Sequence, residues 1–138
     1  MRKDAREAVY RILYAELYND SNGEDFIREV YEDLKLTDSD IDFANSLRSV
    51  IKEHRSEIDA DIDKFAIGYS IERIYSTIKC ALIIAFAELK YFDDIPSVVS
   101  IDEAVTLVRK YSTKDGINFA NGVLASYKKF LENTDENH

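Results

Sequence analysis

The sequence is poor in residues that break helices and in residues that perform covalent chemistry. Its 138 residues include four glycines, one proline, one cysteine, two histidines and no tryptophan. A β-protein of this length needs many tight turns, which glycine and proline supply, so their scarcity favours an all-α fold. One cysteine and two separated histidines offer almost no nucleophile or metal-ligand set. We therefore expect no enzyme, no catalytic residues, no metal site and no cofactor.

Long apolar runs are also missing. No segment approaches the roughly 18 apolar residues of a membrane span, and the N-terminal stretch MRKDAREAVYRILY lacks the apolar core of a signal peptide. The single Cys80 cannot form an internal disulfide and lies in an apolar stretch, where a buried thiol is expected. These features predict a cytoplasmic protein without a membrane partner.

The net charge of −9 is concentrated in one region. Residues 20–63 contain 14 acids and 5 bases, whereas the rest of the chain contains 13 of each. A strongly negative total normally argues against nucleic acid, but the charge-balanced ends leave room for a local basic patch. The alternating acids at 59, 61 and 63 resemble the start of a calcium loop, but Lys64 occupies the position where that loop needs glycine. A solvated acidic face explains them.

Apolar residues repeat with the helical period along most of the chain. The pattern predicts seven helices, at about 4–19, 26–34, 37–54, 56–66, 71–91, 101–111 and 117–132. The segment 71–91 has the broadest apolar face and is expected to be central. Thr37 and Ser100 are predicted N-caps with an acid three residues later, and Ser56 and Ser70 are simpler cap candidates. Residues 1–132 are predicted to form one domain, with a frayed tail at 133–138.

Three stretches resemble the NusB family of bacterial transcription antitermination factors. They are AREAVYRILYAELY at 5–18, LIIAFAELKYFDDIP at 82–96, and VSIDEAVTLVRKYSTKDGINFANGVLASY at 99–127. The last stretch carries the family's I-x-E-A motif and, after a polar turn, its F-x-N-G-V-L motif. The three stretches occur in the family's order and spacing across nearly the whole chain.

This resemblance implies both a fold and a function. The family fold is all-α, with about seven helices in two packed sub-bundles. The implied function is RNA binding at the boxA element of ribosomal RNA leaders, together with the small-subunit ribosomal protein NusE. The resulting complex joins RNA polymerase and suppresses premature termination.

The resemblance and the charge-balanced ends nominate site residues. The RNA-binding candidates are Arg2, Lys3, Arg6, Lys79, Lys90, Lys110, Lys114 and Phe119. The candidates for contact with NusE are Tyr14, Ile78 and Leu82. Each of these cations could instead be a solvated surface charge. Phe119, Tyr14 and Leu82 could instead be core residues. Positions where the family commonly has bases are occupied here by Asp4, Ile83, Tyr91, Phe92 and Asn118. These losses predict weak RNA binding by the chain alone.

The resemblance also places Asn121 and Gly122 inside the last helix. Asn-Gly between apolar residues is otherwise a strong hairpin signal, and a helical glycine costs about 1 kcal/mol relative to alanine. We expect Gly122 to offset this cost by letting a neighbouring helix approach closely. Asn121 either bonds across that contact or faces solvent.

Two other functions are compatible with parts of the sequence. A protein-interaction module of the same fold, with weak or no RNA binding, would use its acidic helices between residues 20 and 63 to meet a basic partner. An RNA methyltransferase is excluded by length, because 138 residues leave no room for a methyl-donor domain beside the helical one.

Overall fold

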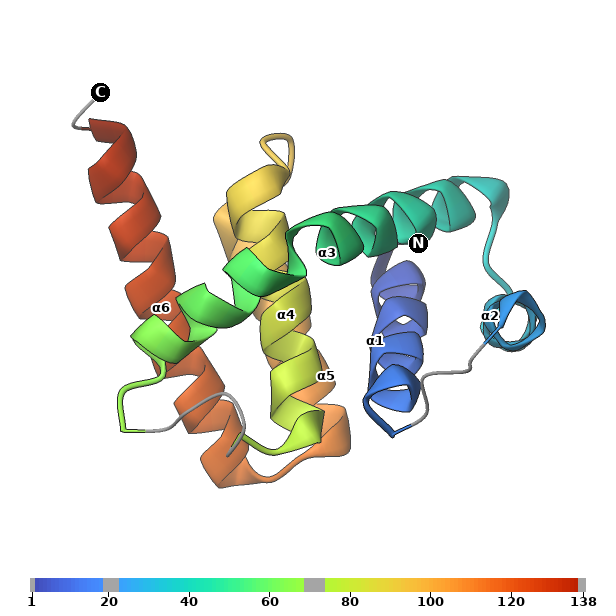
Figure 1. Ribbon diagram of the computed structural model, residues 1–138, viewed down its shortest axis with the longest axis horizontal. Helices are drawn as coiled ribbons and strands as arrows, with labels where there is room; N and C mark the ends of the chain where they lie inside the picture. Colours follow the sequence, from blue (N-terminus) through green and yellow to red (C-terminus); the bar gives the residue numbers. More distant parts are fainter. Residues whose placement is uncertain (1, 19–22, 69–73, 137–138) are drawn as a thin grey trace.

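The structure is a computed structural model that describes residues 2–18, 23–68 and 74–136, and these residues are helical except for short connections (Figure 1). The helices are α1 (Arg2–Tyr18), α2 (Glu24–Asp33), α3 (Asp38–Phe65), α4 (Ser76–Tyr91), α5 (Ser97–Tyr111) and α6 (Lys114–Glu136). No strand occurs in the described ranges, so the predicted all-α class is confirmed. None of the described helices is long and apolar enough to cross a membrane.

Helix α4 is the centre of the fold, as predicted. It packs against α1, α3, α5 and α6, and every residue from 80 to 88 is buried. Cys80 is fully buried within this run, as expected. Burial raises the pKa of its thiol to about 12, so the group stays protonated and unreactive at neutral pH.

The helices form two groups that share α3 (Figure 1). Helices α1 and α2 pack with each other, and α1 packs on α3. Helices α4, α5 and α6 pack together in the second group, and α3 also contacts α4 and α6. This arrangement agrees with the expected two sub-bundles.

The described residues form six helices, one fewer than predicted, because two predicted helices are one. The segments predicted at 37–54 and 56–66 form the single helix α3, which is kinked at His54 (φ −112°, ψ 16°). The predicted cap at Thr37 is confirmed: its side chain accepts from the backbone N–H of Asp40, whose carboxylate accepts from the N–H of Thr37. Ser56 caps nothing, because the chain continues through the kink without leaving the helix.

Other predicted boundaries differ by up to five residues. Helix α5 begins at Ser97, so Ser100 lies in its first turn; its hydroxyl donates to Glu88 instead of capping the helix. Helix α6 starts at Lys114 and continues to Glu136, past the predicted end at 132. Helix α4 begins at Ser76, and the predicted cap at Ser70 lies outside the described residues.

The expectation for Gly122 is wrong. It lies inside α6 as predicted, but it is exposed, and a Cβ added there would meet nothing within 4 Å. No described helix crosses α6 closely at this point, so packing does not offset the glycine's cost. Asn121 is exposed as well, which supports the solvent-facing alternative.

Candidate nucleic-acid interface

The eight predicted RNA-binding residues do not form one surface. Lys79, Lys114 and Phe119 belong to the end of the bundle where α4 and α6 begin, the lower end in Figure 1. Arg2 lies at the start of α1 and Lys90 near the end of α4, toward the opposite end. The remaining three residues, Lys3, Arg6 and Lys110, lie on the α1 and α5 helices.

Arg6 has to be removed from the RNA-binding set. Its side chain is 4% exposed, and its Nε and Nη2 atoms each donate to a carboxylate oxygen of Glu88 at 2.7 Å. Both partners are buried, so this guanidinium is occupied inside the bundle and does not reach a phosphate. The apolar neighbours Ala5, Ala8 and Val9, all fully buried, place this position on the inner face of α1.

The cations at the start of α1 lie among acids. The guanidinium of Arg2 is 4.5 Å from the ring centroid of Phe43 and 3.7 Å from a carboxylate oxygen of Asp94. Lys3 borders a small hollow between α1 and α5 whose acidic members are Asp4, Glu7 and Glu103. These carboxylates reduce the attraction of both cations for a phosphate.

Lys90 and Lys110 are paired within the protein. The ammonium of Lys90 donates to Glu57 and, at 3.2 Å, to Asp61 on α3. Lys110 donates to Glu7 on α1, and this hydrogen bond raises the pKa of the Lys110 ammonium. Both lysines serve helix packing here, and neither adds a strong field for RNA.

A hollow at the start of α4 and α6 is the best candidate for binding bases. We call it the α4–α6 hollow; it has a volume of about 470 Å³ and is lined by Ile74, Tyr75, Ile78, Thr113, Asp115, Gly116 and Phe119. The Tyr75 side chain is 77% exposed, and Phe119 is partly exposed. Two aromatic rings therefore border a hollow of a size that small ligands occupy.

Cations and backbone N–H groups lie near the same hollow. Lys79 follows Ile78 on α4, and Lys114 begins α6; neither forms an ion pair with any described residue. Helix α6 starts at the hollow wall, with Thr113 accepting from the N–H groups of Gly116 and Ile117. The positive end of this helix favours an anion nearby.

Gly116 is the glycine that close packing requires. A Cβ at this position would lie 2.7 Å from the Ser112 hydroxyl oxygen and 3.1 Å from Cδ1 of Ile78. The missing side chain therefore lets the first turn of α6 approach α4 at the hollow wall.

A second hollow is lined in part by Thr77, which precedes Ile78 in the first turn of α4. We call it the tyrosine hollow; its lining residues are Tyr10, Arg11, Tyr14, Thr77 and Tyr111, and its volume is about 330 Å³. The rings of Tyr10 and Tyr111 stack with centroids 4.8 Å apart, and the Tyr10 hydroxyl donates to the Thr77 carbonyl at 2.8 Å. This pairing fixes α1 against α4 and α5 beneath the exposed ring of Tyr14.

The three predicted partner-contact residues have different environments. Tyr14 is 38% exposed and lies beside Tyr18, with ring centroids 5.2 Å apart. Ile78 is largely buried but lines the α4–α6 hollow. Leu82 is fully buried, so its side chain is not available to a partner. The alternative expectation, that Leu82 is a core residue, is confirmed.

Sequence reasoning missed Tyr75, Thr113 and Tyr111 as lining residues. Tyr75 falls inside the helix predicted at 71–91, so the sequence pattern gave no sign of its exposure at the hollow. No local signal marks Tyr111, whose role follows from stacking on a residue of another helix.

Residues 3–129 match the model of the NusB family. The chain belongs to the NusB family. It is similar to the transcription antitermination protein NusB of Ruminiclostridium cellulolyticum, with 34% identity over 93% of this chain and 88% of that protein. The NusB of Dehalococcoides mccartyi is 29% identical over 96% of this chain and 93% of that protein.

Solved NusB structures have the same fold. Thermotoga maritima NusB superposes with a TM-score of 0.83 at 26% identity, covering 94% of this chain and 91% of that one. A crystal structure of antitermination factors NusB and NusE with double-stranded RNA gives a TM-score of 0.83 at 29% identity, covering 93% and 96%.

Proposed function

We propose that this chain is a transcription antitermination factor that binds boxA-type RNA of ribosomal RNA leaders together with a NusE-type ribosomal protein. In this proposal the RNA bases enter the α4–α6 hollow, and the assembled complex joins RNA polymerase. The observation that carries the proposal is the pair of aromatic side chains, Tyr75 and Phe119, at one hollow beside the start of a helix. The solved NusB and NusE complex with RNA supports these two ligands.

The chemistry of the hollow suits single-stranded RNA. Unpaired bases stack on aromatic side chains, at about 1–3 kcal/mol per base. Lys79 in the first turn of α4 and Lys114 at the start of α6 supply positive charges that attract phosphates. The carboxylate of Asp115, in the first turn of α6, can accept from the exocyclic amino group of a base.

The tyrosine hollow is the proposed docking surface for the ribosomal protein. Exposed aromatic groups are enriched where proteins bind one another, and Tyr14 and Tyr18 project beside this hollow. Because the two hollows share the first turn of α4, a bound partner would lie next to the RNA. The partner can then add its own phosphate contacts and link the two binding events.

The charge distribution supports weak binding by the chain alone. Arg6, Lys90 and Lys110 are paired with carboxylates, which leaves few cations for phosphates. Each phosphate neutralised on a single strand contributes about −0.7 to the slope of log affinity against log salt. We therefore expect a shallow salt dependence without the partner and a steeper one with it.

The test is fluorescence anisotropy with a labelled boxA-like RNA, with and without the purified ribosomal partner. The double variant Tyr75→Ala/Phe119→Ala should lose at least tenfold in affinity in both settings, because two stacking platforms are removed. Phe130→Ala is the matched control, since Phe130 is also a partly exposed ring of α6 but lies in another turn of that helix.

Equal RNA affinity of the double variant and the control would contradict the proposed site. No measurable binding to RNA by the wild type in either setting would instead favour the alternative of a protein-interaction module. Tyr14→Ala should weaken binding of the partner and leave RNA binding by the isolated chain unchanged.

A further inference from the structure

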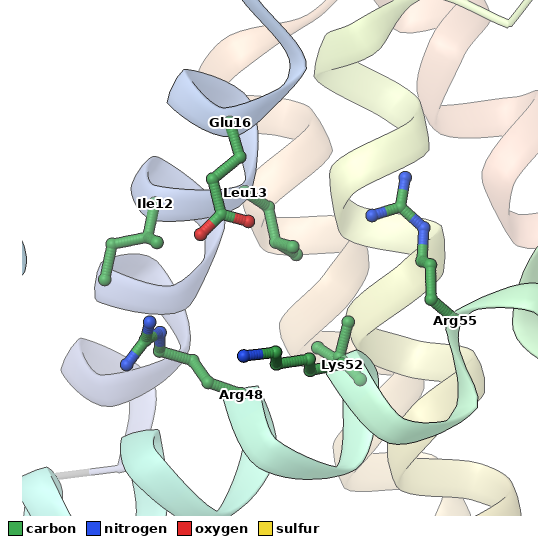
Figure 2. Close-up of a pocket in the computed structure, with 7 residues that line it drawn as sticks. Ile12, Leu13, Glu16, Arg48, Lys52 and Arg55 are labelled. Carbon is green, nitrogen blue, oxygen red and sulfur yellow. The ribbon is translucent and has the colours of Figure 1, made fainter. Parts of the chain in front are cut away.

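A cationic cleft lies between α1 and the middle of α3 (Figure 2). Its volume is about 390 Å³. The apolar side chains at its base are Ile12, Leu13 and Ile51, all buried, and the polar side chains around it are Glu16, Arg48, Lys52 and Arg55. In Figure 2, Arg48 and Lys52 extend from α3 toward α1, the carboxylate of Glu16 extends from α1 toward them, and Arg55 extends from α3 on the side away from Arg48.

The cleft is separate from the proposed RNA and partner surfaces. Ile12 and Glu16 line the cleft, whereas Tyr10 and Tyr14 line the tyrosine hollow. Each residue of an α-helix is turned by about 100° from the last, so residues two apart, such as Tyr10 and Ile12 or Tyr14 and Glu16, point to nearly opposite sides of α1. A ligand in the cleft would leave the tyrosine hollow open.

The charge of the cleft is opposite to that of the segment that builds it. Residues 20–63 hold 14 acids and only 5 bases, yet three of those bases border this one cleft. Arg48 and Lys52 are four residues apart on one face of α3, and Arg55 follows the kink at His54. A solvated acidic helix has no need to gather its few cations in this way.

Two of these cations have no counter-charge at ion-pair distance among the described residues. Arg55 hydrogen-bonds to the carboxylate of Asp59 at 3.0 Å. Arg48 and Lys52 form no ion pair with any residue that the structure describes, and Glu16 is not within ion-pair distance of either. The cleft therefore offers an ammonium and a guanidinium to an external anion.

We propose that this cleft binds the phosphate groups of a nucleotide. A guanidinium can donate two parallel hydrogen bonds to one phosphate, and a lysine ammonium adds a compact charge beside it. The aliphatic stems of Arg48 and Lys52 can pack against a nucleobase or ribose, and Glu16 can accept from a ribose hydroxyl or a base amino group.

The size of the cleft favours a nucleotide over an acidic protein. Pockets for small ligands have volumes of about 300–1,000 Å³, and the cleft falls within that range. A folded acidic surface could meet the rim but could not fill a hollow lined by Ile12 and Leu13. The same phosphate chemistry is available from a free nucleotide or from the 5′ end of an RNA strand, and the experiment separates these two sources.

The test is isothermal titration calorimetry of the full chain with ATP, GTP, inorganic phosphate and a short 5′-triphosphorylated RNA. We expect saturable binding of the nucleotides or of the RNA end, and weaker binding of phosphate alone. The variant Arg48→Ala/Lys52→Ala should lose at least tenfold in affinity, and Arg48→Gln/Lys52→Gln provides the same test with longer side chains if the first variant folds poorly. The matched control Arg28→Ala/Lys129→Ala removes two exposed cations away from the cleft and should bind as the wild type does.

The results of this titration distinguish a failure of the nucleotide site from a failure of the proposed boxA-binding site. Binding that survives in Tyr75→Ala/Phe119→Ala but falls in the cleft variant supports a separate nucleotide site. Binding of the RNA end without binding of free nucleotides identifies the strand as the source. The proposal is overturned if neither nucleotides nor the RNA end give saturable heat, or if the cleft variant and its control bind equally.

Discussion

Arg6 and Glu88 join α1 to α4 by two parallel hydrogen bonds between residues 82 positions apart in the sequence. Both donor–acceptor distances are 2.7 Å, and both side chains are sealed from solvent. Ser100 on α5 donates to the same carboxylate at 2.9 Å. One buried carboxylate therefore ties three helices together and has a partner for each of its oxygens.

Removing one member of this pair should destabilise the fold severely. Arg6→Ala leaves the Glu88 carboxylate buried without its counter-charge, which typically costs about 3–5 kcal/mol. The free energy of unfolding from urea titration measures this loss. The double variant Arg6→Met/Glu88→Leu should recover much of it, because no unpaired charge remains.

Arg2→Ala is the control for this prediction. Arg2 is half-exposed and its contacts are long, so its removal should change the free energy of unfolding by about 0.5 kcal/mol or less. Equal losses for Arg2→Ala and Arg6→Ala would contradict the role of the buried pair. Any effect of an Arg6 variant on RNA binding has to be judged against this loss of folding.

The buried pair also shows how far the sequence could predict the fold and the site. The apolar period predicts the helices, and the spacing of Thr37 and Asp40 predicts the cap, because both features depend only on residues close in sequence. Arg6 was assigned to RNA because it lies in a basic N-terminus, yet its neighbours Ala5 and Val9 mark an inner face. Glu88 is the single charged residue between 80 and 89, which also signals a buried counter-charge. Pairing the two requires the packing of α1 on α4, which no local pattern supplies.

The two glycines of α6 should respond in opposite ways to a larger side chain. Gly122→Ala should stabilise the protein by about 0.5–1 kcal/mol, since the site is open and alanine favours the helix. Gly116→Val should destabilise it by about 1–3 kcal/mol, because the new atoms collide with Ile78 and Ser112. Thermal or urea unfolding of the two variants, compared with the wild type, measures both effects.

The sequence predicts close helix packing at Gly122, whereas the structure has it at Gly116. Asn121-Gly122 is an unusual pair inside a helix, but Gly116 lies in a polar turn, where glycine is common. The demand for a small residue comes from Ile78 on another helix. A destabilised Gly122→Ala variant would restore the original expectation.

Acid should weaken the contact between α3 and the end of α4. Hydrogen bonds from Lys90 and from the Tyr91 hydroxyl hold the pKa of Glu57 below its ordinary value. A carboxylate with a lowered folded pKa contributes stability above its unfolded pKa of about 4.3, and this contribution is lost as the pH falls through the folded pKa. Glu57→Gln should therefore flatten the decline of the unfolding free energy below about pH 4.3.

Glu29→Gln serves as the control for the acid prediction. Glu29 is exposed on α2, and the structure gives it no hydrogen-bond or ion-pair partner among the described residues. Its replacement should leave the acid slope as it is in the wild type. An unchanged slope in Glu57→Gln would show that the Lys90 contact does not persist in solution.

Alkali should weaken the protein through its buried tyrosines. The hydroxyl of Tyr127 donates to Asp61 at 2.9 Å, and its ring stacks on Phe86 with centroids 4.0 Å apart. Burial, and then the hydrogen bond to Asp61, raise the pKa of Tyr127, and burial also raises the pKa of Tyr10. Burial and the hydrogen bond to Glu57 raise the pKa of Tyr91 to about 12.

The sign of this effect follows from the raised folded pKa values. The neutral phenols contribute stability that is fully present below the unfolded pKa of about 10 and is lost as the pH rises through the folded values. The free energy of unfolding should therefore fall steadily above about pH 10, and Tyr127→Phe should make that fall shallower. Because the chain has nine tyrosines and no tryptophan, tyrosinate absorbance follows the titration directly. The buried phenols of Tyr10 and Tyr127 should ionise only when the protein unfolds. A single titration of all nine near pH 10 with the helices intact would contradict this account.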